Sequence, residues 1–257
     1  MTAAPAPSTF TVRRPAAGLA RYVSQYWLSL NNTSAVYAAL PDGCVDLVLE
    51  VTAHGHRSWI YGSTTRPTAI PCQLGTHYLG IRFRPGQSRH FIDAAAHEIT
   101  DGREDLRTLM RFPSERIAAH IATEALFEEL DAILTAALDR SPPVESYIDG
   151  VVQHIDARHG DTRIEDVALR FGKSRRQLER VFLQTVGVPV KFFCVISRLR
   201  HAADLIVQPR SQSLSTIAHD AGYSDQAHMT RDFARLAGTS PGRLRADGAF
   251  FQYHAAR

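Results

Sequence analysis

Residues 214–245 read LSTIAHDAGYSDQAHMTRDFARLAGTSPGRLR. Apolar side chains recur in the first part at i, i+3, i+4 and i+7, the spacing of one buried helix face; they are Leu214, Ile217, Ala218 and Ala221. Gly222 follows at once and predicts the end of this helix. A second helix is predicted over Asp225–Leu236, and its inward residues are Met229, Phe233 and Leu236. Two short helices joined by a tight turn are therefore expected.

The same pattern occurs fifty residues earlier, where Gly172 corresponds to Gly222. The apolar face before Gly172 has the same spacing and consists of Ile164, Val167, Ala168 and Phe171. The helix after it buries Leu178, Val181, Phe182 and Val186. A longer helix, opened by Pro189 and running to about Val207, is predicted between the two units. The C-terminal part is therefore an internal duplication of helix, turn and helix.

Two helix starts carry capping signals. Thr162 stands three residues before Glu165, and Ser174 stands three residues before Gln177. In such a pair the first side chain accepts a hydrogen bond from the backbone near the second residue. Helices are therefore predicted to begin just after Thr162 and just after Ser174.

A helix-turn-helix unit places its second helix in the major groove of DNA, with exposed side chains facing base edges. Arg suits guanine or phosphate, Gln suits adenine, and Glu accepts from cytosine. The exposed positions of the two second helices are Arg175, Arg176, Gln177, Glu179, Arg180 and Gln184, then Asp225, Gln226, His228, Thr230, Arg231 and Arg235. Ordinary solvated helix faces also carry such residues, but two units in tandem at matched spacing favour DNA binding.

Residues from about 146 to 245 resemble the DNA-binding domain of the AraC/XylS family of transcription regulators. In the second unit the resemblance rests on Ile217-Ala218, Ala221-Gly222-Tyr223, Asp225, His228, Arg231, Phe233, Gly238, Ser240-Pro241 and Arg245. In the first unit it rests on Val167-Ala168, Ser174, Leu178, Arg180, Phe182, Gly187, Arg198-Leu199 and Ala202. The resemblance implies a monomeric DNA reader whose two units, on one rigid linker helix, grip major-groove segments about 34 Å apart.

By this resemblance, the family's base-contacting positions fall on Arg176, Glu179 and Arg180, then on Gln226, Ala227, His228, Thr230 and Arg231. The candidate DNA-binding set is completed by Ser174, Arg175, Gln177 and Asp225. Ala227 departs from the polar character of the others and offers only an apolar contact, such as to a thymine methyl. Glu179 repels phosphate, so it either reads a base or makes no contact.

Composition and charge exclude several classes of protein. The chain has 257 residues, of which 44% are hydrophobic and 21% charged, as in ordinary globular proteins. No apolar run reaches the eighteen residues of a membrane span. Residues 1–143 hold 13 Lys and Arg against 14 Asp and Glu, whereas residues 144–257 hold 16 against 12. This basic excess fits a polyanionic partner. Three scattered cysteines, Cys44, Cys72 and Cys194, indicate neither a disulfide framework nor a zinc site.

The first hundred residues are predicted to be rich in strands. Runs with aromatic or β-branched residues alternate with turn signals; they are Tyr22–Leu30, Val45–Val51, Ser58–Tyr61 and Tyr78–Phe83. A helical pattern covers Ser114–Arg140 and stops at Pro142-Pro143. We expect an α+β chain: a β-rich, cupin-like regulatory domain at 1–113, a helical connector and candidate dimerisation segment at 114–143, and an all-α DNA-binding domain at 144–257.

Two segments, Leu40–Val48 and Gly80–Gly86, resemble a domain of unknown function found ahead of AraC-type DNA-binding domains, over roughly residues 10–110. That resemblance implies no particular activity. Four residues either line a pocket mouth or serve in turns and salt bridges: Asp42, Asp46, Arg82 and Arg84. Cys44 is either a reactive thiol or a small buried strand residue. His54 and His56 lack a nearby Glu and are expected to be a loop pair rather than a metal site.

We interpret the chain as a cytoplasmic, sequence-specific DNA-binding transcription regulator and not an enzyme. Its expected partners are double-stranded promoter DNA and an unidentified small-molecule effector, with RNA polymerase and a second copy of the chain as further candidates. No membrane, metal ion or cofactor is expected, and no catalytic residue is assigned. The alternative is a cupin-like, metal-dependent enzyme with an accessory DNA-binding domain.

Overall fold

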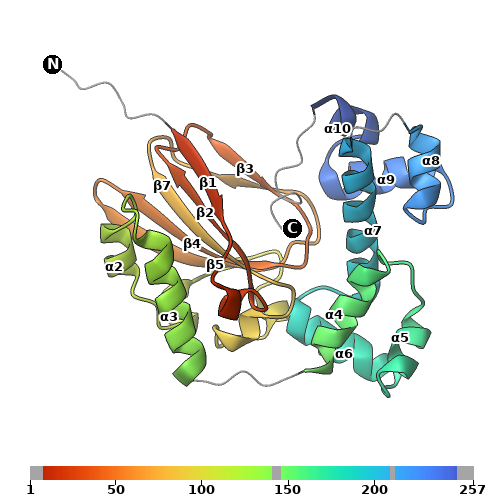
Figure 1. Cartoon of the computed structure of the whole chain (residues 1–257), viewed down its shortest axis with the longest axis horizontal. Helices are drawn as coiled ribbons and strands as arrows, with labels where there is room; N and C mark the ends of the chain where they lie inside the picture. Colours follow the sequence, from red (N-terminus) through yellow and green to blue (C-terminus); the bar gives the residue numbers. More distant parts are fainter. Residues whose placement is uncertain (1–7, 141–145, 209–211, 248–257) are drawn as a thin grey trace.

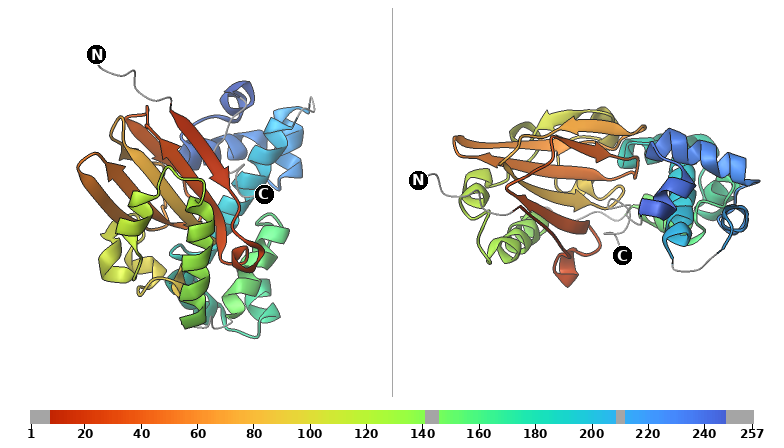
Figure 2. Two further views of the ribbon diagram at one scale, coloured as in Figure 1. Left: turned by 60° about the vertical axis from the view of Figure 1, so that its left-hand side comes forward. Right: turned by 90° about the horizontal axis from the view of Figure 1, so that it is seen from above.

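The computed structural model describes residues 8–140, 146–208 and 212–247. A β-rich N-terminal half and a helical C-terminal half lie side by side (Figure 1; Figure 2). The α+β organisation expected from the sequence is therefore confirmed.

The strands of the described residues form two antiparallel sheets. They are β1 (Thr9–Arg13), β2 (Val23–Leu30), β3 (Val36–Ala39), β4 (Val45–Thr52), β5 (Gly55–Tyr61), β6 (Thr68–Pro71), β7 (His77–Phe83) and β8 (Arg103–Asp105). The large sheet has the order β1-β2-β7-β4-β5-β8, and β3 pairs with β6 in a second sheet. The four predicted runs are present as β2, β4, β5 and β7. Short helices connect some of the strands: η1 (Ala17–Leu19), η2 (Ser88–His90) and η3 (Ala96–Glu98). The helix α1 (Leu106–Leu109) follows β8, the last strand.

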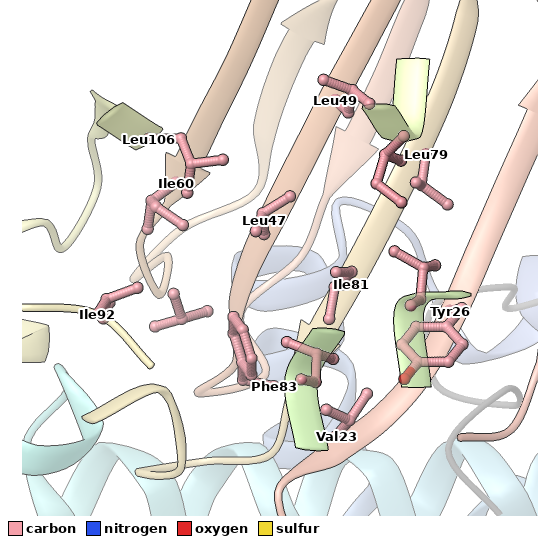
Figure 3. Packing of buried hydrophobic residues seen from close by; sticks show 14 of the residues in the cluster. Val23, Tyr26, Leu47, Leu49, Ile60, Leu79, Ile81, Phe83, Ile92 and Leu106 are labelled. Atoms are coloured by element: carbon pink, nitrogen blue, oxygen red, sulfur yellow. The ribbon is translucent and has the colours of Figure 1, made fainter. Parts of the chain in front are cut away.

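One face of the large sheet carries the N-terminal hydrophobic core (Figure 3). Successive side chains of a strand point to opposite faces, so Leu47 and Leu49 of β4 lie on this face with Ile81 of β7, all fully buried. The face is covered by α2 (Ser114–Ala119) and α3 (Leu126–Arg140) (Figure 1). Their buried side chains belong to the same cluster as the sheet; they are Ile117, Leu126, Leu130 and Leu134. The segment expected to be a connector thus packs as part of the N-terminal core.

The described part of the C-terminal half consists of helices. They are α4 (Tyr147–Ala157), α5 (Ile164–Arg170), α6 (Arg175–Val186), α7 (Val190–Val207), α8 (Leu214–Asp220), α9 (Gln226–Ala237) and α10 (Pro241–Asp247). In Figure 1, α7 stands upright with α4–α6 at its first end and α8–α10 at its second. The duplicated units are α5–α6 and α8–α9. Among the described residues no single helix is long and apolar enough to cross a membrane. The bent pair α6 and α7 together has the length and composition of a membrane span.

Most of the apolar pattern of both units is buried as the sequence predicts, whereas Phe171, Val181 and Leu214 are half-buried and pack against the clusters. Phe182 of α6 lies in one helical cluster and Phe233 of α9 in a second, and both side chains are fully buried. The linker helix α7 supplies Phe193 to the first cluster and Leu199 to the second. One helix therefore belongs to two cores.

The capping prediction holds for one helix start and is wrong for the other. The Ser174 hydroxyl accepts from the Gln177 N–H at 3.2 Å. In contrast, α5 has Arg163 at its N-cap position without a side-chain cap bond. The preceding turn passes through Gly160 with a φ of 74° and takes up the Thr162 N–H, which bonds to the Gly160 carbonyl at 3.1 Å. The helix therefore starts one residue later than a Thr162 cap would require.

Truncation of either equivalent phenylalanine should destabilise its unit. We expect Phe182→Ala and Phe233→Ala each to lower the free energy of unfolding by about 3–5 kcal/mol, because each leaves a cavity in a closed core. Urea denaturation measures the change. Leu169→Ala is the control, since this side chain is 80% exposed and its removal should alter stability little. Equal stability of wild type and Phe182→Ala would contradict the packing.

Candidate nucleic-acid interface and N-terminal cavity

The second helices of the two units, α6 and α9, have the same kinds of ends. Ser174 caps α6, and the Asp225 carboxylate caps α9 by accepting from the His228 N–H at 2.7 Å. Each helix ends at a left-handed glycine, Gly187 with a φ of 88° and Gly238 with a φ of 63°. The caps fix where each helix begins and hence which of its side chains point outward.

We call α6 and α9, the second helices of the two helix-turn-helix units, the recognition helices. One face of each recognition helix is fully buried. The buried residues are Leu178, Phe182 and Val186 on α6, and Met229, Phe233 and Leu236 on α9. In the first unit, the ring centres of Phe182 and Phe193 lie 5.6 Å apart, which joins α6 to α7. The opposite faces, which carry most of the candidate DNA-binding residues, are turned toward solvent.

The outward face of α6 combines a fixed ion pair with exposed arginines. Arg175 contacts Glu179 at 2.8 Å and Glu165 of α5 at 2.6 Å. Glu179 is therefore balanced by a neighbouring positive charge, which reduces the repulsion of phosphate expected from its sequence position. Arg176 and Arg180 are exposed and lie on the same helix as this pair.

The outward face of α9 is more varied. Gln226, Ala227 and Arg231 are exposed. The Thr230 hydroxyl donates to the Gln226 carbonyl at 2.8 Å, so it is turned back toward its own helix. Arg231 is consequently the long basic side chain available in the middle of this face.

His228 is held by its neighbours. Its Nδ1 lies 3.1 Å from the Ser224 hydroxyl, and its Nε2 lies 3.8 Å from Asp232. Its ring meets Tyr223 edge-on at a centroid distance of 5.1 Å. These contacts connect His228 to residues at the start and in the middle of α9, and its place among the base-contacting positions stays a prediction.

Polar contacts attach α7 to α4 and to the second unit. The Ser197 hydroxyl donates to Asp156 of α4 at 3.0 Å, and Arg200 pairs with the same carboxylate. The Arg198 guanidinium lies 5.5 Å from the centre of the Tyr223 ring, between α8 and α9. Together with the two apolar clusters, these contacts hold the recognition helices in a fixed relation.

The other face of the large sheet borders a cavity of about 700 Å³, which the β3–β6 sheet encloses from the opposite side. Trp27 and Tyr37 stack within it at a centroid distance of 6.3 Å. A Cβ at Gly80 would lie 1.9 Å from the Trp27 indole, so glycine is what allows this ring to lie on the sheet. Arg103 and Trp59 also line the cavity, and the Arg103 guanidinium lies 4.4 Å from the Trp59 ring centre. Cavities of roughly 300–1,000 Å³ with apolar and aromatic walls are typical of small-molecule sites.

A buried charge cluster forms one end of the cavity. Arg82 donates to both carboxylate oxygens of Asp46 at 3.0 Å, and it contacts Asp42 at 3.0 Å. These three residues line the cavity and are also salt-bridge partners. The pocket interpretation and the salt-bridge interpretation of the sequence therefore both apply to them. Arg84 instead donates to the Ala20 carbonyl at 2.7 Å and does not belong to this cluster.

Cys44 is a buried residue beside this cluster. Its N–H donates to Asp42 at 2.9 Å. Burial, followed by the nearby Asp42 charge, raises the pKa of the Cys44 thiol well above its usual value. The thiolate is the reactive form, so this environment favours the small buried cysteine over the reactive thiol.

The histidines considered for a metal site lie apart from the cavity. His54 is exposed in the turn between β4 and β5, and His56 of β5 lies 3.9 Å from Glu115. Within the residues described, no group of three or more His, Cys, Asp or Glu side chains is placed to hold a metal ion.

The residues that join the two halves were missed by sequence reasoning. Asp149 of α4 is buried and accepts from Arg89 at 2.8 Å and from Gln87 at 2.9 Å. Arg21 lies 3.4 Å from the same carboxylate. The one available signal was an acidic residue inside an apolar helix face, next to Ile148.

The cavity aromatics were missed as well. Trp59 and Tyr61 alternate on β5, in the manner of residues that share one face of a sheet. This alternation was the signal that could have placed them together on the cavity wall.

Comparisons with known proteins match two separate parts of the chain. Residues 11–105 match a domain of unknown function (DUF6597), and residues 167–247 match a helix-turn-helix domain. The arabinose operon regulatory protein of Salmonella typhimurium is 26% identical over 168 residues, which cover 64% of this chain and 57% of that protein. Its Escherichia coli counterpart is equally similar, with 54% of its length covered. The chain thus spans little more than half the length of these relatives.

A shorter relative is covered more fully. The probable transcription factor PqrA of Proteus vulgaris is 30% identical over 97 residues, which cover 38% of this chain and 79% of that protein. Among solved structures, ToxT from Vibrio cholerae has the same fold at a TM-score of 0.50 and 8% identity, with 93% of this chain and 98% of that chain aligned. The chain belongs to the AraC/XylS family of helix-turn-helix transcription regulators, with a DUF6597 domain at its N-terminal side.

Proposed function

We propose that the protein is a sequence-specific DNA-binding regulator that places α6 and α9 in successive major-groove segments of a promoter. The observation that carries this proposal is the pair of capped helices, each buried on one face and polar on the other, on the shared helix α7. A cytoplasmic location and contact with RNA polymerase belong to the same proposal, because a regulator bound at a promoter lies beside the site at which RNA polymerase binds.

The residues divide into proposed base readers and proposed supports. Arg176, Arg180, Gln226 and Arg231 are exposed and long enough to reach base edges, so we assign base reading to them. Ser174 and Asp225 cap the starts of α6 and α9. Gln177 is exposed near the start of α6. Arg175 and Glu179 form an ion pair, and each orients the side chain of the other. Ala227 offers a methyl contact, whereas Thr230 and His228 are engaged within the protein.

The N-terminal cavity is proposed to bind a small-molecule effector. Its volume of about 700 Å³ and its aromatic side chains, including Trp27, Tyr37 and Trp59, support this role. Dimerisation through the N-terminal half is kept as part of the proposal, although the large apolar residues of α3 are mostly used inside its own core.

The central arginines should determine base preference. A guanidinium that forks onto guanine O6 and N7 contributes about 1–3 kcal/mol against the wrong base. We therefore expect Arg180→Ala and Arg231→Ala each to relax preference at one or two base pairs, with the two positions about one helical turn apart. Selection from randomised duplexes measures this. An unchanged motif with uniformly weaker binding would assign both arginines to phosphate and leave base reading to Arg176 and Gln226.

Binding should depend steeply on salt. Each phosphate contact on duplex DNA lowers log K by roughly 0.9 per unit of log salt concentration. We expect a slope equivalent to several contacts for the wild type, measured by fluorescence anisotropy of a labelled duplex between low and physiological salt. The control is Arg57→Ala, which removes a positive charge from β5 of the N-terminal half and should leave the slope unchanged. Binding that is indifferent to salt would rule out the DNA-binding proposal.

Ligand entry should be visible in the fluorescence of the protein itself. The two tryptophans of the chain, Trp27 and Trp59, both line the cavity. We expect the aromatic dye 8-anilinonaphthalene-1-sulfonate to quench their emission saturably, and Val48→Phe, which adds bulk to the cavity wall, to weaken binding by roughly tenfold, or 1.4 kcal/mol. An unchanged melting temperature checks the fold of the variant. Equal quenching in both proteins would place the dye elsewhere.

A further inference from the structure

The N-terminal half supplies the C-terminal cap of the first recognition helix. The last carbonyl groups of a helix have no partner inside the helix. The Ser63 hydroxyl donates to the carbonyl of Val186, the last residue of α6, at 2.8 Å. The Thr100 hydroxyl donates to the carbonyl of Gly187 at 2.6 Å. Two carbonyls at the end of a DNA-facing helix are therefore satisfied by side chains from the other half of the chain.

Within the described residues, no side chain of the N-terminal half caps the end of the second recognition helix in this way, although its sequence is a repeat of the first. A Cβ at Gly187 would lie 3.0 Å from the Ser63 hydroxyl and 3.0 Å from the Thr100 hydroxyl. A Cβ at the equivalent Gly238 would have no atom of the described residues within 4 Å. Leu40 of the N-terminal half packs against the second cluster, and this packing is distinct from the hydroxyl caps at the end of α6. The caps thus distinguish two otherwise equivalent helix ends.

The two loops that carry the capping hydroxyls are tied to each other. The Gly62 N–H donates to the Gly102 carbonyl at 3.1 Å, and the Asp101 N–H donates to the Ser63 carbonyl at 2.9 Å. The Asp101 carboxylate also accepts from the backbone and the hydroxyl of Thr65, at 2.7 and 2.6 Å. A shift of one loop therefore moves the other.

The same loops form part of the cavity wall. Gly62 and Thr64 flank Ser63, and both of them line the cavity. Asp101 and Gly102, which follow Thr100, line it as well. Each capping hydroxyl thus lies next in sequence to a residue that a ligand in the cavity would touch.

A second contact connects the charged end of the cavity to the linker helix. Asp42 and Cys44 line the cavity, and Gly43 between them packs on Phe193 of α7, where an added Cβ would lie 2.9 Å from the ring. Phe193 belongs to the cluster of the first unit. The Ser63 and Thr100 caps and the contact of Gly43 with Phe193 therefore both connect the cavity wall to the first unit.

We propose that the N-terminal half regulates DNA reading through the first recognition helix, by means of the Ser63 and Thr100 caps, while α9 reads its half-site independently. This inference rests on the proposed function. Occupation of the cavity shifts the loops at 62–64 and 100–102, and the shift changes how α6 is held. Because coupling between two sites is reciprocal, DNA bound at α6 must also alter the cavity.

The test uses the full chain, a labelled duplex obtained by selection on the wild type, and the two cavity tryptophans as reporters. Anisotropy measures DNA binding, and tryptophan emission is recorded in the same titration. We expect DNA to change the tryptophan emission of the wild type. The double variant Ser63→Ala, Thr100→Val should still bind DNA but lose this change. Its base preference should relax in the half-site of α6 and remain in that of α9.

A matched pair of variants provides the control. Gly187→Ala and Gly238→Ala impose the same kind of left-handed strain on a residue with a side chain, but only the first also presses on the caps. We expect Gly187→Ala to change the tryptophan emission in the absence of DNA, and Gly238→Ala to leave it as in the wild type.

The outcomes separate the inference from the proposed function. If the wild type binds DNA and its tryptophan response is the same in the double variant, the inference fails while the DNA-binding proposal stands. Equal relaxation of both half-sites in the double variant also overturns it, because the effect would then not be confined to α6. If the wild type binds no duplex, the proposed function fails and the inference fails with it.

Discussion

The packing of α7 into two separate apolar clusters is the constraint on which the arrangement of the C-terminal half depends. A helix of 18 residues is about 27 Å long at 1.5 Å per residue. Its first part packs against α6 through Phe193, and its second part packs against α8 and α9 through Leu199 and Ala203. The separation of the two recognition helices is therefore set by a continuous helix of a length comparable to one turn of B-DNA, rather than by a flexible linker.

The duplicated units are stabilised by the same kinds of internal contacts, but they have different neighbours in the structure. Both have an oxygen cap at the start of the recognition helix, a buried phenylalanine in its middle and a left-handed glycine at its end. The N-terminal half bonds to Asp149 on α4, a helix that packs in the cluster of the first unit, and to the end of α6. Leu40 of the N-terminal half packs against the second cluster. Equivalent sequences thus acquire unequal mechanical roles from their neighbours, which a comparison of the repeats by themselves does not reveal.

Periodicity predicted most of the elements, because burial of one face imposes it. The faces of α6 and α9 were found from apolar spacing, and β2, β4, β5 and β7 from their aromatic and β-branched runs. The strands that escaped prediction are short or largely exposed, as in β8, which has three residues. The segment at 114–140 was predicted to be helical. Its packing on the sheet could not be predicted, because it depends on strands more than fifty residues away, such as β4 with Leu47.

The candidate site was predictable in a similar way only where it follows a local pattern. The outward residues of α6 and α9 follow directly from the positions of the buried ones. The contacts of His228 with Ser224 and Asp232 do not follow from this spacing, because they depend on side-chain orientation. Ser63 and Thr100 carry no periodic signal, since their partners are backbone carbonyls 123 and 87 residues away.

The charge cluster at the end of the cavity limits how the proposed effector could be bound. Arg82 already contacts two carboxylates at 3.0 Å and is almost fully buried. An anionic ligand that displaced Asp42 or Asp46 would leave a buried carboxylate without its partner, which typically costs about 3–5 kcal/mol. Burial already raises the pKa of Asp42, so its charged form is held by the contact with Arg82. Recognition without that cost relies on the aromatic surfaces of Trp27, Tyr37 and Trp59. The cluster instead maintains the turn at Gly43 on which Phe193 packs.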